Sequence, residues 1–218
     1  MKTLDAALQH ILTYPILPVF YHDDASICLE TIKACYAGGI RVFEFVNRGA
    51  KAKDNFAHLV QQRDEHFPEM LLGIGTIKSK EEAENFLTLG ADFIVSPITD
   101  AKIAQVTIQK DILWIPGCMT PTEISIAEKT GAPLAKLFPG NLLGTDFLKA
   151  IKPLFPHMRF MPTGGVSPTA ESIDAWFDAG VSAVGMGSKL FEKPADAEGY
   201  QWLVDKAKAL TNIVYKKA

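Results

Sequence analysis

The chain lacks the features that would place it in a membrane or on a nucleic acid. No stretch reaches the roughly 18 consecutive apolar residues of a membrane-spanning helix. Its 22 lysines and arginines stand against 25 aspartates and glutamates, a formal net charge of −3, and the basic residues are scattered. Nucleic acids and anionic membrane surfaces attract proteins through clustered basic residues. We therefore expect neither as a partner.

Cysteine is scarce and histidine shows no metal-ligand spacing. The three cysteines, Cys28, Cys35 and Cys118, form no CxxC pair and are odd in number, which is typical of reduced thiols in a cytoplasmic protein. The first twenty residues contain charged residues and prolines and do not resemble a signal peptide. The five histidines are spaced unlike zinc ligands. We expect no metal and a cytoplasmic location.

Linkers and low-complexity segments are absent too, so residues 1–218 are expected to form one domain. Short apolar runs alternate with segments whose apolar residues recur at helical spacing. The runs are 15–21, 42–46, 71–77, 93–98, 113–117, 134–138, 159–163 and 183–187, and a further helix is expected at about 4–12.

Eight strand–helix units predict an α/β fold, a single (β/α)₈ TIM barrel with an extra N-terminal helix. The rival is a doubly wound open sheet. That fold usually has fewer strands and a glycine-rich turn after the first one. Here the first apolar run is followed by "YHDDAS", which contains no glycine.

Two opposite charges fall on expected strands whose carboxyl ends would form the active-site face of a barrel. In "VFEFV", Phe43 and Phe45 share one face, which suits the layer between sheet and helices, so Glu44 is expected to face the barrel interior. In "LAKLF", Lys136 can face inward by the same alternation. A glutamate and a lysine could therefore meet at the barrel mouth.

This pair has a chemical interpretation and a structural one. Burial disfavours the charged form of a lysine, and a neutral amine can attack a ketone to form an imine. Glu44 could then move the protons. Alternatively, the two residues form a structural ion pair, or Lys136 binds an anion.

Glycines follow the seventh and eighth expected strands, in "PTGGV" and "GMGS". Glycine lets backbone N–H groups approach an anion closely, and the loops after these two strands often bind phosphate in this fold. The alternative is that the glycines only turn the chain.

These residues, in this order, resemble the aldolases that act on 2-keto-3-deoxy-6-phosphogluconate (KDPG) and 4-hydroxy-2-oxoglutarate (KHG). The resemblance extends from about 16 to 190, and its most specific pieces are "GIRVFEFVNR", "GIGT", "FIVSP", "IPGCMTPTE", "KLFP" and "PTGGV". It implies a class I aldolase that cleaves a 2-keto-4-hydroxy acid to pyruvate and an aldehyde without metal or organic cofactor. It also implies a homotrimer.

The resemblance implies a role for each site residue. Lys136 resembles the Schiff-base lysine and Glu44 the proton-transferring glutamate. The substrate-binding residues it implies are Arg48, Thr76 and Thr163 for the keto acid, and Gly164, Gly165, Gly187 and Ser188 for a phosphate.

The chain departs from the family pattern at several positions. Val46 and Asn47 replace Thr and Leu in the "EVTLR" motif, Gly140 and Asn141 replace a common Ala-Glu, and Met186 replaces a glycine. KDPG, its galactonate epimer and non-phosphorylated KHG therefore stay open as substrates. A phosphosugar isomerase or epimerase, and a non-catalytic sensor of sugar acids, are the alternative functions.

Overall fold

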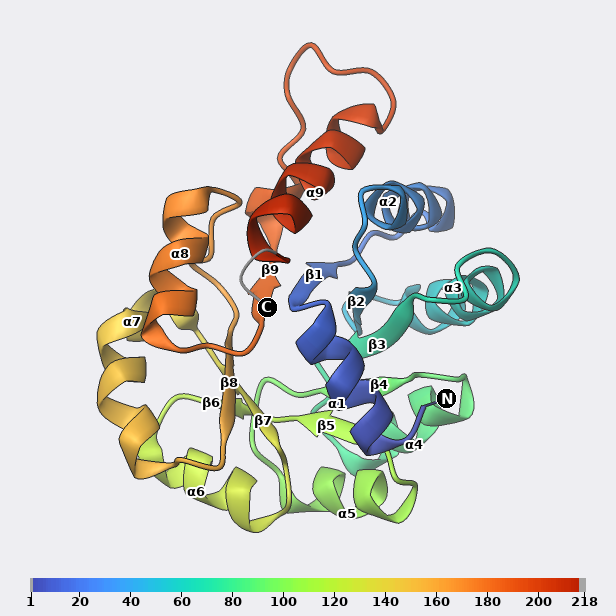
Figure 1. The fold of residues 1–218 in the computed structure, drawn as a ribbon. Coiled ribbons are helices and arrows are strands. Elements are labelled where there is room, and N and C mark those ends of the chain that lie inside the picture. The colour runs from blue at the N-terminus through green and yellow to red at the C-terminus, as the bar shows by residue number, and fades with distance from the viewer. Residues whose placement is uncertain (1, 216–218) are drawn as a thin grey trace.

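The computed structural model describes residues 2–215, and parallel strands form a barrel that helices surround (Figure 1). The strands are β1 (Ile16–Phe20), β2 (Val42–Val46), β3 (Leu71–Gly75), β4 (Phe93–Val95), β5 (Leu113–Ile115), β6 (Gly117–Cys118), β7 (Leu134–Leu137), β8 (Arg159–Pro162) and β9 (Val184–Met186). The helices are α1 (Leu4–Thr13), α2 (Ala25–Ala37), α3 (Ala52–His66), α4 (Lys80–Thr88), α5 (Ala101–Gln109), α6 (Pro121–Lys129), α7 (Gly140–Ile151), α8 (Ala170–Ala179) and α9 (Gln201–Val214), with 3₁₀ helices η1 (Lys152–Leu154) and η2 (Ser188–Phe191).

The strands close into a barrel through two sheets. One has the order β5-β4-β3-β2-β1-β9 and the other β6-β7-β8, and every pair is parallel. A bridge between Thr163 and Gly185 joins β8 to β9, and β5 continues into β6 along the chain. The predicted (β/α)₈ barrel with its additional N-terminal helix is therefore confirmed.

The fifth predicted strand, 113–117, is interrupted in the structure. Pro116 separates β5 from β6, because proline has no N–H to donate to a neighbouring strand. Its carbonyl still accepts a hydrogen bond from the Lys136 N–H at 2.8 Å. The interruption lets β5 pair with β4 while β6 pairs with β7, so this segment joins the two sheets.

The barrel interior and the surrounding layer contain different side chains. Phe43 and Phe45 are fully buried in the large cluster between strands and helices, as predicted. Val42 and Leu134 face inward, in a second cluster with the strand residues Leu17, Leu71, Phe93, Val95, Leu113, Ile115 and Met161 and with Ala183, which directly precedes β9. The inward positions of Glu44 and Lys136 follow from the same alternation.

Helix α1 covers the end of the barrel from which the strands start. Its buried residues Ala7, Leu8 and Ile11 pack into the interior cluster, and Figure 1 shows α1 lying across that end. The side chain of Thr3 caps the helix by accepting from the Ala6 N–H at 3.3 Å. The carboxyl ends of the strands thus form the other, open end of the barrel.

Candidate active site

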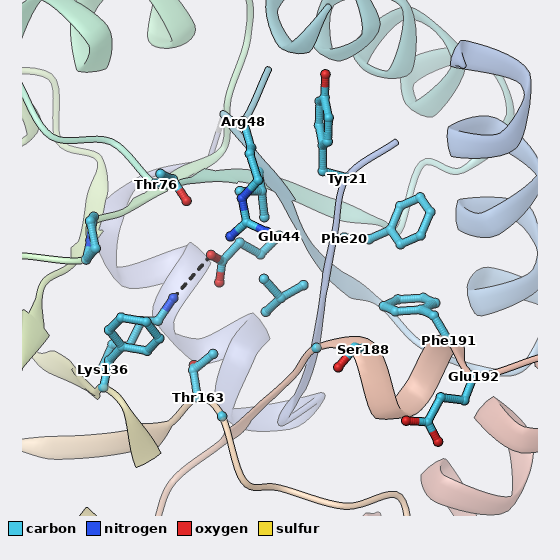
Figure 2. Close-up of a pocket in the computed structure, with 16 residues that line it drawn as sticks. Phe20, Tyr21, Glu44, Arg48, Thr76, Lys136, Thr163, Ser188, Phe191 and Glu192 are labelled. Atoms are coloured by element: carbon cyan, nitrogen blue, oxygen red, sulfur yellow. Dashed lines mark hydrogen bonds and ion pairs between the residues drawn. The ribbon is translucent and has the colours of Figure 1, made fainter. Parts of the chain in front are cut away.

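A cavity of about 630 Å³ lies at the carboxyl ends of the strands. Its lining comes from the ends of β1, β2 and β7 and from the segments after β3, β4, β8 and β9 (Figure 2). Eight of the nine predicted site residues line it: Glu44, Arg48, Thr76, Lys136, Thr163, Gly164, Gly187 and Ser188.

Lys136 and Glu44 meet at the base of this cavity. Nζ of Lys136 lies 3.3 Å from Oε1 of Glu44, and the two side chains are 7% and 1% exposed (Figure 2). The ring of Phe138 lies over the amine, with its centroid 5.3 Å from Nζ. The lysine is thus held by one carboxylate and flanked by an aromatic ring, and it lines the cavity.

Glycines on β3 make room for this carboxylate. A Cβ on Gly75 would come within 2.0 Å of Oε1 of Glu44, and a Cβ on Gly73 would come within 2.3 Å of the Phe93 ring. Both positions face the barrel interior, where a side chain would displace these neighbours. The motif "GIGT" therefore has a packing role that the sequence analysis did not recognise.

Arg48 and Thr76 stand beside the pair, on the loops after β2 and β3. Arg48 is exposed and its guanidinium points toward Glu44 (Figure 2). Thr76 has a φ of 62°, which is rare for a β-branched residue and is found mostly where the surrounding structure imposes it. The enforced backbone turns Thr76 toward the cavity.

Thr163 and the two glycines after it form the next part of the wall. Oγ1 of Thr163 is buried and has no hydrogen-bond partner among residues 2–215, and the same holds for Oε2 of Glu44. Such buried oxygens call for a bound partner, because a lost hydrogen bond costs about 1–3 kcal/mol. Thr163 and Glu44 both line the cavity, so a bound ligand or water can supply the missing hydrogen bond to each oxygen.

Gly164 and Gly165 have positive φ values of 87° and 76°. Their turn packs against the start of α7: a Cβ on Gly165 would lie 2.8 Å from the Cα of Asn141. Gly140 packs as closely, since its Cβ would lie 2.5 Å from the Gly164 carbonyl oxygen. Gly164 lines the cavity, whereas Gly165 is not among the lining residues.

Gly187 and Ser188 line the cavity after β9. Ser188 is the first residue of η2, where a backbone N–H has no acceptor within its own helix. Lys189 follows Ser188 but does not line the cavity, and its Nζ donates to Oγ of Ser167 at 2.8 Å.

The sequence analysis missed an aromatic and acidic part of the wall. Phe20, Tyr21, Phe191 and Glu192 line the cavity away from Lys136, and Figure 2 shows Phe191 and Glu192 beside Ser188. Phe20 and Tyr21 stand at the carboxyl end of β1, so the rule that located Glu44 could have found them. Glu192 follows η2, which the sequence analysis did not predict.

Metal-binding clusters and membrane-spanning helices are both absent from the described part of the chain. Residues 2–215 contain no group of three or more histidine, cysteine, aspartate or glutamate side chains able to hold a metal ion. None of the helices described here is long and apolar enough to span a bilayer.

The chemistry available at the cavity follows from these positions. A buried amine within reach of a keto carbon can form an imine, and a carboxylate beside it can move protons. The exposed guanidinium of Arg48 suits a carboxylate ligand. The arrangement is thus suited to covalent catalysis on a keto acid.

Comparison with known proteins agrees with this chemistry. The family model described as KDPG and KHG aldolase matches residues 8–204. The chain is 31% identical over 167 residues to the 2-dehydro-3-deoxy-phosphogluconate aldolase of Treponema pallidum (strain Nichols), covering 76% of each protein. It is 31% identical over 170 residues to the KHG/KDPG aldolase of Escherichia coli (strain K12), covering 77% of this chain and 78% of that protein.

A solved structure is similar over almost the whole chain. The KDPG aldolase of Legionella pneumophila, in a structure with pyruvate captured as a covalent carbinolamine intermediate, has a TM-score of 0.83 and 26% identity. The match covers 94% of this chain and 97% of that one. The protein therefore belongs to the KDPG and KHG aldolase family and is a class I aldolase, a lyase that breaks a carbon–carbon bond of its substrate.

Proposed function

We propose that this aldolase cleaves a 2-keto-3-deoxy sugar-acid phosphate to pyruvate and a phosphorylated aldehyde, with Lys136 as the imine-forming residue. The observation that carries this proposal is the buried Lys136–Glu44 pair at the base of a cavity. Residues 1–218 would form one aldolase domain. It would act on a small-molecule substrate and would need neither a metal nor an organic cofactor.

The reaction begins with attack of the neutral Lys136 amine on the keto carbon, C2. Loss of water from the carbinolamine gives a protonated imine. A base removes the proton of the C4 hydroxyl, the C3–C4 bond breaks, and its electron pair moves toward the imine nitrogen. The aldehyde leaves and an enamine remains. Protonation at C3 and hydrolysis of the imine release pyruvate and regenerate the lysine.

Glu44 would move the protons in these steps. Oε1 contacts the lysine nitrogen, while the buried Oε2 has no partner among the described residues. One oxygen can thus hold the amine while the other receives or returns a proton, directly or through a water. Arg48 and Thr76 would bind the carboxylate at C1, and Thr163 would donate to an oxygen of the keto acid.

The phosphate end of the substrate would lie at Gly164, Gly187 and Ser188. Support comes from the positions of these residues at the cavity wall, from the Ser188 hydroxyl, and from the Ser188 N–H at the first residue of η2. Gly165 would act indirectly, because its close packing on Asn141 fixes the turn that presents Gly164. KHG and the galactonate epimer of KDPG are the competing substrates.

Pyruvate release from purified protein tests this proposal. We expect kcat/KM for KDPG to exceed that for KHG by at least about a hundredfold, since two charged hydrogen bonds contribute roughly 1.5–3 kcal/mol each. Ser188→Ala should reduce this preference without preventing imine formation with pyruvate. Equal kcat/KM for the two substrates would contradict the phosphate site. No cleavage of any 2-keto-4-hydroxy acid would contradict the proposed function.

We also propose that the protein is a homotrimer in the cytoplasm. Exposed apolar side chains stand at the cavity end of the barrel, near β4, β6 and α7: Ile98 is 42% exposed, Met119 44% and Leu142 68%. Contacts between copies would remove them from water. Free thiols at all three cysteines suit a reducing compartment. Light scattering should give three times the mass of one chain, and a monomer would contradict the assembly.

A further inference from the structure

The wall of the cavity farthest from Lys136 combines two contacting aromatic rings with a carboxylate. The rings of Phe20 and Phe191 have centroids 4.7 Å apart and are tilted by 53°. Phe191 ends η2, and Glu192 follows it directly. All three line the cavity, and Figure 2 shows Glu192 beside Phe191 on the Ser188 side. The far end of a substrate bound at Lys136 would therefore meet this wall.

Glu192 differs from the other charged side chains of the cavity. The charged lining residues are Glu44, Arg48, Lys136 and Glu192. Glu44 and Lys136 form the buried pair, and Arg48 lies next to them. Glu192 is exposed and, among the described residues, has no side-chain ion pair. Its negative charge is consequently available to whatever occupies the far end of the cavity.

Among the described residues, the nearby lysines Lys189 and Lys206 form no ion pair with the Glu192 carboxylate. Lys189 donates to Oγ of Ser167 at 2.8 Å. Lys206 of α9 donates to two backbone carbonyls, that of Lys189 at 2.9 Å and that of Glu192 at 3.4 Å. Together with the fully buried Leu190, these bonds anchor the segment on α9. The backbone of Glu192 is held in place while its side chain is left free.

We propose that Glu192 is a specificity residue that disfavours a substrate ending in a phosphate dianion and accepts a hydrogen bond from a terminal hydroxyl. A carboxylate repels a dianion, and like charges brought together at a binding site are a common means of rejecting a ligand. A hydroxyl donates to a carboxylate, and the rings of Phe20 and Phe191 can pack against the carbon chain. This inference rests on the proposed function. Glu192 opposes the attraction of the Ser188 N–H and hydroxyl for a phosphate. The ratio of kcat/KM for phosphorylated to hydroxyl-ended substrates is therefore smaller than Ser188 alone would give.

The test compares Glu192→Gln with the unmodified protein on two substrates, KDPG and the same keto acid without its phosphate. We expect kcat/KM for KDPG to rise about fivefold at low ionic strength, roughly the effect of two unit charges at 4 Å in water. For the unphosphorylated substrate kcat/KM should fall, because a neutral amide accepts a weaker hydrogen bond from the terminal hydroxyl than a carboxylate does. In 1 M salt the gain on KDPG should largely disappear, because screening then acts over about 3 Å.

Glu198→Gln is the matched control, since Glu198 is an exposed glutamate of the same segment that does not line the cavity. It should change neither substrate. Binding of inorganic phosphate, measured calorimetrically, separates this inference from the reaction: Glu192→Gln should bind it about fivefold more tightly. Equal effects of Glu192→Gln on both substrates, or unchanged phosphate affinity, would overturn the role of Glu192 even in an active aldolase. Absence of cleavage with tighter phosphate binding would instead overturn the proposed reaction alone.

Discussion

Nζ of Lys136 lies 3.3 Å from Oε1 of Glu44, although 92 positions separate the two residues in the chain. They come from β7 and β2 and are both buried. A buried ion pair is weak evidence for stability, because desolvation of both charges offsets much of their attraction. Their position at the base of an open cavity favours a catalytic explanation instead.

Glu44→Gln should separate proton transfer from imine formation. Glutamine keeps the shape of the side chain but is a poor base, so exchange of the pyruvate methyl protons should slow by about 10²–10⁴-fold. Borohydride trapping of pyruvate should persist. Proton exchange can be followed by NMR in deuterated water. Exchange at the unmodified rate would assign the proton transfer to another group.

Gly75→Ala should disturb the same carboxylate from the neighbouring strand. The added Cβ would come within 2.0 Å of Oε1 of Glu44, which must then move away from Lys136. We expect proton exchange to fall at least about tenfold, because misplaced catalytic groups lose much of their effect. Gly73→Ala is the control on the same strand and face, where the contact is with Phe93. If both variants lower the melting temperature and slow exchange equally, the effect is general unfolding of β3.

Thr163→Val should affect stability and activity differently. The Thr163 hydroxyl is buried without a partner among the described residues, so replacing it with a methyl group should cost less than about 1 kcal/mol of unfolding free energy or stabilise the protein. Cleavage should nevertheless slow by about tenfold or more if the hydroxyl binds substrate. Denaturant unfolding and kcat/KM measure the two effects. Unchanged kcat/KM would leave the hydroxyl without a catalytic role.

The cysteines should be inert to alkylation of the folded protein. Burial raises the pKa of Cys118 to about 11 and that of Cys28 to about 11, and burial also raises the pKa of Cys35. At pH 7.5 these thiols are therefore almost wholly protonated, and the thiol form is unreactive. Iodoacetamide should leave both mass and activity unchanged. Cys118 lies on β6, which pairs with β7, the strand that carries Lys136. Rapid modification of Cys118 with loss of activity would contradict this prediction.

The alternation of side chains along strands is local information, which is why the sequence analysis could place Glu44 and Lys136 inside the barrel. The strand at 42–46 was predicted with its observed bounds. The interruption at Pro116 was missed because it depends on which neighbour each half of the segment pairs with. Its apolar residues alone predict that 113–117 forms one continuous strand.

The roles of several glycines could not be predicted from the sequence, because they depend on atoms distant in the chain. Gly75 is required by Glu44, and Gly140 by the Gly164 carbonyl. Gly140 was read as a departure from the family pattern, yet the structure gives it a packing reason. Glu192 was missed for a similar cause: its position depends on the bonds from Lys206 to the segment around η2.

The central claim is that Lys136 forms the imine, and reductive trapping tests it most directly. Pyruvate and borohydride should leave one stable adduct per chain, located by mass spectrometry on the peptide that contains Lys136. Lys136→Arg should form no adduct and lose turnover, because a guanidinium is effectively always protonated. An adduct on a different lysine, or none on the active protein, would contradict the account.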